Sequence, residues 1–262
     1  MIDKAAILKD ITKAETKMFF AKAVDKAYMA EKTYEPAFTY FTDPVTAGEF
    51  MRAAERNTDM KISIFGGYDG AERAMIGFFP EYTDENAESF PISAVEVSYN
   101  GKYSSKLSHR DYLGSVMGLG ITRERVGDII IKDEGAVIMA ESEIADFIAS
   151  SLGKVGHTKV KCRIVDINDV ISDDNGTDMN ITVMSMRIDA ILSKGLNISR
   201  GTAAELIKSE KVFVNWKNVI SSSIGIKEND IITVRGIGRI KINEIVGKTK
   251  KDRILIKLCR YK

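Results

Sequence analysis

Residues 196–216 read LNISRGTAAELIKSEKVFVNW and contain a helix start, a helix and a strand in close succession. Ser199 precedes an apolar pattern with helical spacing, which predicts that its hydroxyl caps a helix. The residues expected on the buried face of that helix are Ala203, Ala204, Leu206 and Ile207. The following VFVNW predicts a strand that runs through Trp216. Arginine and lysine recur outside the apolar face, so the stretch predicts a helix and a strand that present a basic surface.

The sequence on either side extends this unit. A short upstream helix is expected to end at Gly195, which would adopt the left-handed conformation of a helix cap. The expected apolar face of that helix is Ile188, Ile191 and Leu192. Downstream, DIITVRG and RIKINEI alternate as strands. Gly236 and Gly238 therefore predict a tight turn with Arg239 at its edge, since no helix follows as it does in a nucleotide-binding loop.

Charge is distributed unevenly along the 262 residues. Residues 187–262 contain 17 Lys and Arg against 7 Asp and Glu, a net charge of +10. The remaining 186 residues contain 21 against 30, a net charge of −9, so the overall charge of +1 conceals two opposite parts. Concentration of the basic excess in one folded segment favours a surface that binds a polyanion. Arg200, Lys208, Lys211 and Lys217 are expected to cluster there around one helix and the next strand, facing the phosphates of a folded RNA.

Residues 1–82 predict an N-terminal α/β domain. Apolar residues at helical spacing predict a helix over Lys4–Glu31. Asp43 followed by Pro44 predicts a second helix start. KISIF and RAMIGFF predict two strands joined by a turn. The acidic, Pro-flanked stretch 80–91 predicts the boundary with the next domain.

Residues 88–178 predict a ferredoxin-like domain with the element order βαββαβ. Ser108 is expected to cap the first of its two helices, with Asp111 in the position of a capping box. Its strands lack the aromatic pairs of RNA-recognition modules, so this domain is not expected to read an RNA sequence. Residues 173–180 are the expected linker to the basic domain at 183–262, and the fold class is α+β.

Other features exclude several classes of protein. No run of 18 apolar residues is present, so no membrane contact is expected. Charged residues interrupt the first 20 residues, so no signal peptide and a cytoplasmic location are expected. Cys162 and Cys259 lie far apart and are expected to be thiols. With His109 and His157 they match no familiar zinc spacing, so no metal and no cofactor are expected.

Two sets of residues carry a resemblance to known proteins. The first set is Arg187-Ile188-Asp189, Leu192, Ser199-Arg200, Ala203, Ile207, Val212, Val214-Asn215 and Asp230-x-Ile232-x-Val234. At this spacing the chain resembles the α-L RNA-binding motif, which is named for the small-subunit ribosomal protein S-four. The second set is FGGYDGAER, HRDYLGSVMGLGITRERVGDI, VNWK and VRGIGRIKI. With these, the chain from Phe41 to Arg253 resembles the YlmH family of bacterial ribosome-associated proteins.

The resemblance implies a protein that binds structured ribosomal RNA or tRNA on the large ribosomal subunit and stabilises peptidyl-tRNA when stalled chains are rescued. We expect it to be monomeric. The RNA contacts expected in the basic domain are Arg187, Lys194, Ser199, Arg200, Thr202, Lys208, Lys211, Asn215, Lys217, Arg235 and Arg239. Arg110, Arg123 and Arg125 allow two roles: a secondary contact to RNA or ribosomal protein, or that of exposed structural arginines. Many family members have glycine where this chain has Glu210 and Trp216.

Three side chains in the basic domain each allow two roles. Arg200 could contact a phosphate, or it could only pair with Glu205 or Asp189. Asp189 is expected to cap its helix or to pair with Arg187. Trp216 could stack on a base or serve as a packing residue.

An RNA-modifying enzyme of the pseudouridine synthase or methyltransferase type is the alternative function, since the α-L module also occurs on such enzymes. The sequence lacks a glycine-rich S-adenosylmethionine loop after a strand and any nucleotide-binding signature. The two regions outside the basic domain are also small for those catalytic folds. A binding protein without catalytic residues is therefore favoured. A scaffold of the division or membrane machinery has no support in the residues.

Overall fold

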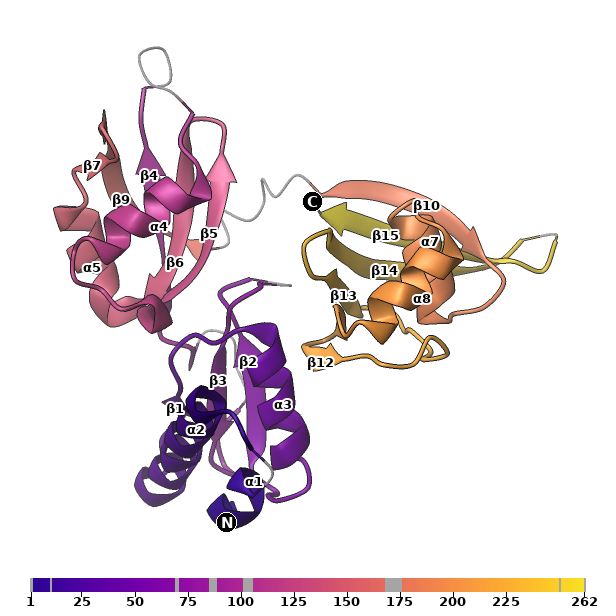
Figure 1. The fold of residues 1–262 in the computed structure, drawn as a ribbon, viewed down its shortest axis with the longest axis horizontal. Helices are drawn as coiled ribbons and strands as arrows, with labels where there is room; N and C mark the ends of the chain where they lie inside the picture. Colours follow the sequence, from indigo (N-terminus) through magenta and orange to yellow (C-terminus); the bar gives the residue numbers. More distant parts are fainter. Residues whose placement is uncertain are drawn as a thin grey trace. The chain divides into compact units, whose positions relative to one another are not determined.

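The computed structural model describes the chain except for residues 1, 10, 69–70, 85–88, 101–105, 168–175, 250 and 262. The chain forms two compact units, Met1–Asp173 and Asp174–Lys262 (Figure 1). Each unit combines helices with antiparallel sheets, so the predicted α+β fold class is confirmed. In the described part of the chain, no helix is both long and apolar enough to cross a membrane.

The N-terminal part of the first unit packs helices against a three-stranded antiparallel sheet with the order β1-β3-β2. Its elements are α1 (Lys4–Leu8), α2 (Ala14–Thr33), β1 (Ala37–Phe38), α3 (Pro44–Ala54), β2 (Lys61–Phe65) and β3 (Met75–Phe79). Asp43 caps α3 as predicted, because its Oδ1 accepts hydrogen bonds from the N–H groups of Val45 at 2.9 Å and Thr46 at 3.2 Å. Asp43 therefore satisfies N–H groups that have no partner within the helix.

The single helix expected over Lys4–Glu31 is wrong, because the chain forms two helices there. Asp3 caps α1 by accepting a hydrogen bond from the N–H of Ala6. Ile7 on α1 and Phe20 on α2 are both buried in the same core. One straight helix would place these two side chains on nearly opposite faces. The break between the helices allows both to enter one core, which the helical periodicity alone could not indicate.

The second part of the first unit has the predicted βαββαβ order. Its elements are β4 (Ile92–Ser98), α4 (His109–Met117), the 3-10 helix Arg123–Arg125, β5 (Val126–Lys132), β6 (Gly135–Glu141), α5 (Ser142–Ser151), β7 (Lys154–Val155), β8 (Thr158–Lys159) and β9 (Lys161–Val165). The main sheet has the antiparallel order β5-β6-β4-β9, which is ferredoxin-like as predicted. The capping box is also confirmed, since the Asp111 carboxylate accepts from the N–H and the hydroxyl of Ser108.

Tyr112 on α4 gives a test of how this core is packed. Its ring is fully buried, and its hydroxyl has no hydrogen-bond partner among the described residues. Burial raises the pKa of this hydroxyl to about 12. An unpaired buried hydroxyl is costly, so Tyr112→Phe should raise the free energy of unfolding by about 1 kcal/mol. Thermal denaturation measures this change.

A matched control for this substitution is Tyr28→Phe. The Tyr28 hydroxyl donates a hydrogen bond to the Ile2 carbonyl at 2.9 Å, so its removal should lower stability. A lower melting temperature for Tyr112→Phe would contradict the account of this core.

The two parts of the first unit are joined through Asp128 on β5. Its carboxylate accepts hydrogen bonds from the Tyr68 hydroxyl at 2.8 Å and from the N–H groups of Glu72 at 2.6 Å and Arg73 at 3.0 Å. The Arg73 guanidinium in turn donates to the carbonyls of Phe41 at 3.0 Å and of Val126 at 3.1 Å. Burial lowers the pKa of Arg73, against the opposing effect of the Asp128 charge. The bonded segment around Arg73 therefore fastens the N-terminal sheet to the ferredoxin-like part.

The second unit is a six-stranded antiparallel sheet with two helices. Its elements are β10 (Thr177–Val183), α7 (Ile188–Gly195), α8 (Arg200–Lys208), β11 (Val212–Val214), β12 (Lys217–Asn218), β13 (Ile231–Val234), β14 (Gly238–Lys248) and β15 (Ile254–Tyr261). The strand order is β10-β15-β14-β13-β11-β12. Both helices and the sheet contribute to one core, which includes the predicted Ile188, Ile191, Leu192, Ala203 and Ile207.

Three expectations for this unit need correction. Part of the expected linker at 173–180 is strand, because β10 begins at Thr177 and pairs along β15; residues 173–175 lie outside the described residues. Gly195 is not left-handed but is the last residue of α7, and Asn197 has the positive φ of 56°. A Cβ on Gly195 would lie 2.5 Å from the Ile240 Cδ1, so close packing explains this glycine. The strand of VFVNW ends at Val214, since Asn215 and Trp216 form a two-residue turn.

Candidate RNA-binding surface

Two arginines and a buried carboxylate connect the starts of α7 and α8. Asp189, in the first turn of α7, is only 7% exposed. Its Oδ2 accepts a hydrogen bond from the Arg200 Nη2 at 2.6 Å, and its Oδ1 accepts from the Arg187 Nε at 3.2 Å. Arg187 occupies the N-cap position of α7 without a capping bond from its side chain, and Arg200 is the first residue of α8. We call these three residues the arginine clamp, because one carboxylate fixes two guanidinium groups near two helix starts.

The clamp keeps Asp189 ionised. Burial by itself raises the pKa of Asp189, but the hydrogen bonds and positive charges of Arg200 and Arg187 outweigh it, and the pKa lies below its usual value. The side chain of Arg200 is still 60% exposed and that of Arg187 is 46% exposed. A guanidinium has five N–H donors, so each arginine can pair with Asp189 and present further donors to solvent. The expected pairing of Asp189 with Arg187 is confirmed.

The start of α8 follows the prediction made from Ser199. The Ser199 Oγ accepts a hydrogen bond from the Thr202 N–H at 3.0 Å, and the two side-chain hydroxyls lie 2.8 Å apart. Both residues are exposed. The first turn of a helix has N–H groups without helical partners and a partial positive charge, which favour a bound anion. Arg200 therefore lies where the backbone also attracts a phosphate.

The other predicted basic contacts lie mostly on exposed positions of the same unit. Lys194 is in the last turn of α7 and Lys208 is in the last turn of α8. Lys211 and Arg235 are neighbours, since the Arg235 N–H donates to the Lys211 carbonyl at 2.9 Å. Lys217 lies on β12 at the edge of the sheet. All five side chains are exposed, so the electrostatic field of this unit is open to a polyanion.

Two predicted contacts have their polar groups engaged within the protein. The Asn215 Nδ2 donates to the Asp230 Oδ1 at 2.8 Å, and its Oδ1 accepts from the Ile231 N–H at 2.9 Å. Arg239 is half-buried, with its guanidinium 5.0 Å from the ring centre of Tyr261. Asn215 therefore fixes the turn between β11 and β12, and Arg239 packs on an aromatic face.

The three arginines expected in a secondary contact differ in their surroundings. Arg110 is exposed on α4. The Arg123 guanidinium donates to the Val126 and Gly127 carbonyls, and burial, with the charge of Arg73, lowers its pKa to about 10. Arg125 pairs with Glu141 and Glu143. Internal bonds thus engage Arg123 and Arg125, whereas Arg110 faces solvent.

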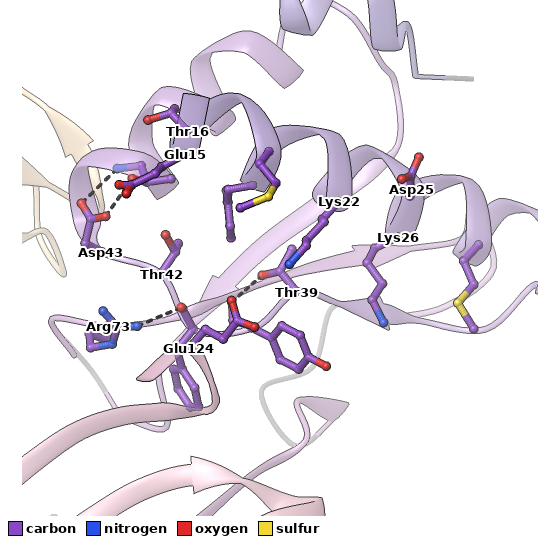
Figure 2. A pocket seen from close by; sticks show the side chains of 16 residues that line it. Glu15, Thr16, Lys22, Asp25, Lys26, Thr39, Thr42, Asp43, Arg73 and Glu124 are labelled. Carbon is purple, nitrogen blue, oxygen red and sulfur yellow. Dashed lines mark hydrogen bonds between the residues drawn. The ribbon is translucent and has the colours of Figure 1, made fainter. Parts of the chain in front are cut away.

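A cleft of 760 Å³ in the first unit was not indicated by the sequence (Figure 2). Lys22 and Lys26 point into it from α2, while Asp43 and Arg73, already bonded as described, line its other end. Lys22 and Lys26 are four residues apart, so helical spacing could have placed both on one face of α2, together with the exposed Met18 and Met29. In the described parts of the chain no three His, Cys, Asp or Glu residues gather as metal ligands. Cys162 and Cys259 are not joined in a disulfide.

Comparison with protein-family models finds three consecutive matches. Residues 15–83 match the N-terminal domain of YlmH, residues 85–169 match a proposed RNA-binding domain in YlmH, and residues 186–232 match the S4 domain. The last match includes the arginine clamp and the turn at Asn215. The sequence resemblance is therefore found independently in each part of the chain.

Two proteins are similar to this chain over long stretches. The "Ribosome-associated protein quality control protein P2" of Bacillus subtilis (strain 168) is 32% identical over 251 residues, which are 95% of this chain and 96% of that protein. A solved structure, "Cell division protein ylmH from Streptococcus pneumoniae", is 25% identical with a TM-score of 0.51, and the match covers 61% of this chain and 96% of that one. The chain matches the YlmH domain models, and it is 32% identical to the Bacillus subtilis protein over 95% of its own length. The chain therefore belongs to the YlmH family.

Proposed function

We propose that this protein is a ribosome-associated factor that binds structured RNA of the large subunit and tRNA, and that it stabilises peptidyl-tRNA when stalled chains are rescued. The arginine clamp is the observation that carries the proposal. It fixes two exposed guanidinium groups beside the capped start of α8. A guanidinium can bind a phosphate through two parallel hydrogen bonds, which suits a folded RNA backbone.

The charge of the second unit supports an RNA ligand. Residues 174–262 contain 17 Lys and Arg against 9 Asp and Glu, a net charge of +8. Basic side chains release counterions from RNA when they bind its phosphates, and this release favours binding at low salt. The quality-control function in the name of the Bacillus subtilis relative supports the ribosome as the place of action. We further propose that the protein acts in the cytoplasm as a monomer.

The salt dependence of RNA binding tests this proposal. The full chain should bind ribosomal RNA and tRNA, and its affinity should fall by roughly 100-fold between about 50 and about 200 mM salt. A filter-binding or anisotropy titration at several salt concentrations measures this slope. Equal affinity at all salt concentrations, or no binding at low salt, would contradict an electrostatic RNA-binding surface.

We propose a binding factor and not an RNA-modifying enzyme. In the cleft of the first unit, Asp43 is engaged as a helix cap and Arg73 holds three backbone carbonyls. Both charged groups at that end of the cleft therefore stabilise the fold through these hydrogen bonds. Incubation with unmodified ribosomal RNA and tRNA, with and without S-adenosylmethionine, should leave the nucleosides unchanged by mass spectrometry. The appearance of pseudouridine or of a new methyl group in the RNA would show instead that the protein is an RNA-modifying enzyme.

A further inference from the structure

Trp216 occupies a backbone conformation that its side chain does not favour. Val214 pairs with Lys217, so Asn215 and Trp216 are the two residues of the turn that joins β11 and β12. Their φ angles are 46° and 67°. A two-residue turn of this kind requires positive φ at both positions, where asparagine and glycine are common and bulky residues are strained. Asn215 suits its position, whereas Trp216 holds a conformation that glycine would adopt without strain.

Trp216 lies outside the core of the second unit. Trp216 is half-buried. The core of the second unit and the partly buried apolar side chains packed against it do not include Trp216, within the range that the structure describes. Its ring has no aromatic partner among those residues, and its indole N–H has no hydrogen-bond partner there. Strained residues occur preferentially at binding sites, and this one lies outside the core, which makes Trp216 a candidate ligand contact.

The surroundings of Trp216 suit a nucleotide. The Asn218 side chain donates to the Glu210 carbonyl at 2.9 Å and the Val212 carbonyl at 3.3 Å, which holds β12 beside the segment that follows α8. The exposed Lys211 belongs to that segment, and the exposed Lys217 follows Trp216 directly. A large aromatic ring followed directly by a cation offers a face for a base and a charge for its phosphate. The turn also lies at the outer edge of the sheet, where β12 pairs with β11 and with no other described strand.

We propose that Trp216 is a stacking platform for an unpaired base of the bound RNA. This inference rests on the proposed function, because it requires RNA to reach the second unit. Stacking on a flat ring does not depend on base identity, so Trp216 would favour loops and unpaired ends over continuous duplex without reading a sequence. Lys217 beside the turn, and Lys211 at the other end of β11, would hold the adjoining phosphates.

The intrinsic fluorescence of the protein reports on this site directly, because Trp216 is the single tryptophan among the 262 residues. The full chain is titrated with three probes of equal length: a single-stranded oligoribonucleotide, a hairpin with an unpaired loop, and a continuous duplex. Trp216 emission should be quenched by the single strand and the hairpin and much less by the duplex. Trp216→Gly should lower affinity for the first two probes by about 5- to 100-fold. Trp216→Phe should recover part of this loss.

Glu210→Gly is the matched control. Glu210 also has a positive φ, of 57°, and lies in the adjoining segment, so its replacement by glycine relieves the same kind of strain without removing a ring. Glu210→Gly should retain the wild-type affinity or exceed it, because an anion is lost.

Trp216→Gly should melt at the wild-type temperature or above it, because glycine adopts the positive φ of this position without strain.

The possible failures are distinguishable. No RNA binding by the wild-type chain would refute the proposed function and the stacking role together. RNA binding with unchanged Trp216 emission and unchanged affinity of Trp216→Gly would refute stacking alone. A lower melting temperature for Trp216→Gly, with wild-type affinity for Trp216→Phe and unquenched emission, would show that Trp216 is a packing residue.

Discussion

A fragment of residues 174–262 is expected to retain nearly all of the RNA affinity of the full chain, whereas residues 1–173 should bind at least about 100-fold more weakly. The first fragment has a net charge of +8, and the second has 21 Lys and Arg against 28 Asp and Glu, a net charge of −7. An acidic surface repels RNA phosphates at a distance, while the basic unit attracts them and also contains the arginine clamp. Titration of both fragments with ribosomal RNA measures the difference.

The place of the cut decides whether this experiment is valid. A fragment that begins at residue 181 would lack Thr177–Asn180, which pair with Arg260, Cys259, Leu258 and Lys257 on β15. The fragment should therefore begin at residue 174 and show a cooperative melt of its own. The shorter fragment, beginning at 181, is the control and should melt at a lower temperature. Equal RNA affinity of fragments 1–173 and 174–262 would contradict the assignment of RNA binding to the basic unit.

Arg200→Ala is expected to lower RNA affinity by about 1–3 kcal/mol while the fold remains intact. The side chain is 60% exposed, so its removal takes little from the core. Its guanidinium lies beside the first turn of α8 and is oriented by Asp189 at 2.6 Å. Arg200→Lys should recover part of the loss, because an ammonium restores the charge without the two parallel donors. Thermal melts of both variants verify the fold.

Asp189→Asn separates the two roles that the sequence allows for Arg200. If net charge alone decided RNA affinity, removing this carboxylate would strengthen binding. If the carboxylate orients Arg187 and Arg200, as their shared hydrogen bonds indicate, its loss should weaken binding although the unit becomes more positive. Wild-type affinity for Arg200→Ala, or tighter binding by Asp189→Asn, would mean that the pair is structural only.

Much of the fold could be predicted because its signals are local. Asp43, Ser108 and Ser199 each precede a helix that they cap, and the ferredoxin-like order follows from alternating helical and strand periods. The expected linker at 173–180 is partly strand for a different reason. β10 is held by pairing with β15, more than 70 residues later in the chain, and no local pattern contains that partner.

The candidate RNA-binding site could likewise be predicted only where its signals are local in the sequence. The basic residues and the start of α8 could be recognised from charge and capping. The shared partner of Arg187 and Arg200 could be stated only as one alternative, because it depends on how closely α7 and α8 pack. Gly195 is a second example of a role that depends on tertiary packing. A glycine near a helix end suggests a helix cap, but here the missing side chain leaves room for Ile240 of β14 to pack against α7. The turn at Trp216 became visible only through the pairing of Val214 with Lys217.

We propose that the basic unit of this protein holds RNA on large ribosomal subunits that retain peptidyl-tRNA. Sedimentation of the purified full chain with such subunits through a sucrose gradient tests it most directly, with empty large subunits and Arg200→Ala as controls. We expect the wild-type chain to co-sediment with subunits that carry peptidyl-tRNA, and Arg200→Ala to remain largely at the top of the gradient. Wild-type protein that stays at the top with both kinds of subunit would contradict the claim.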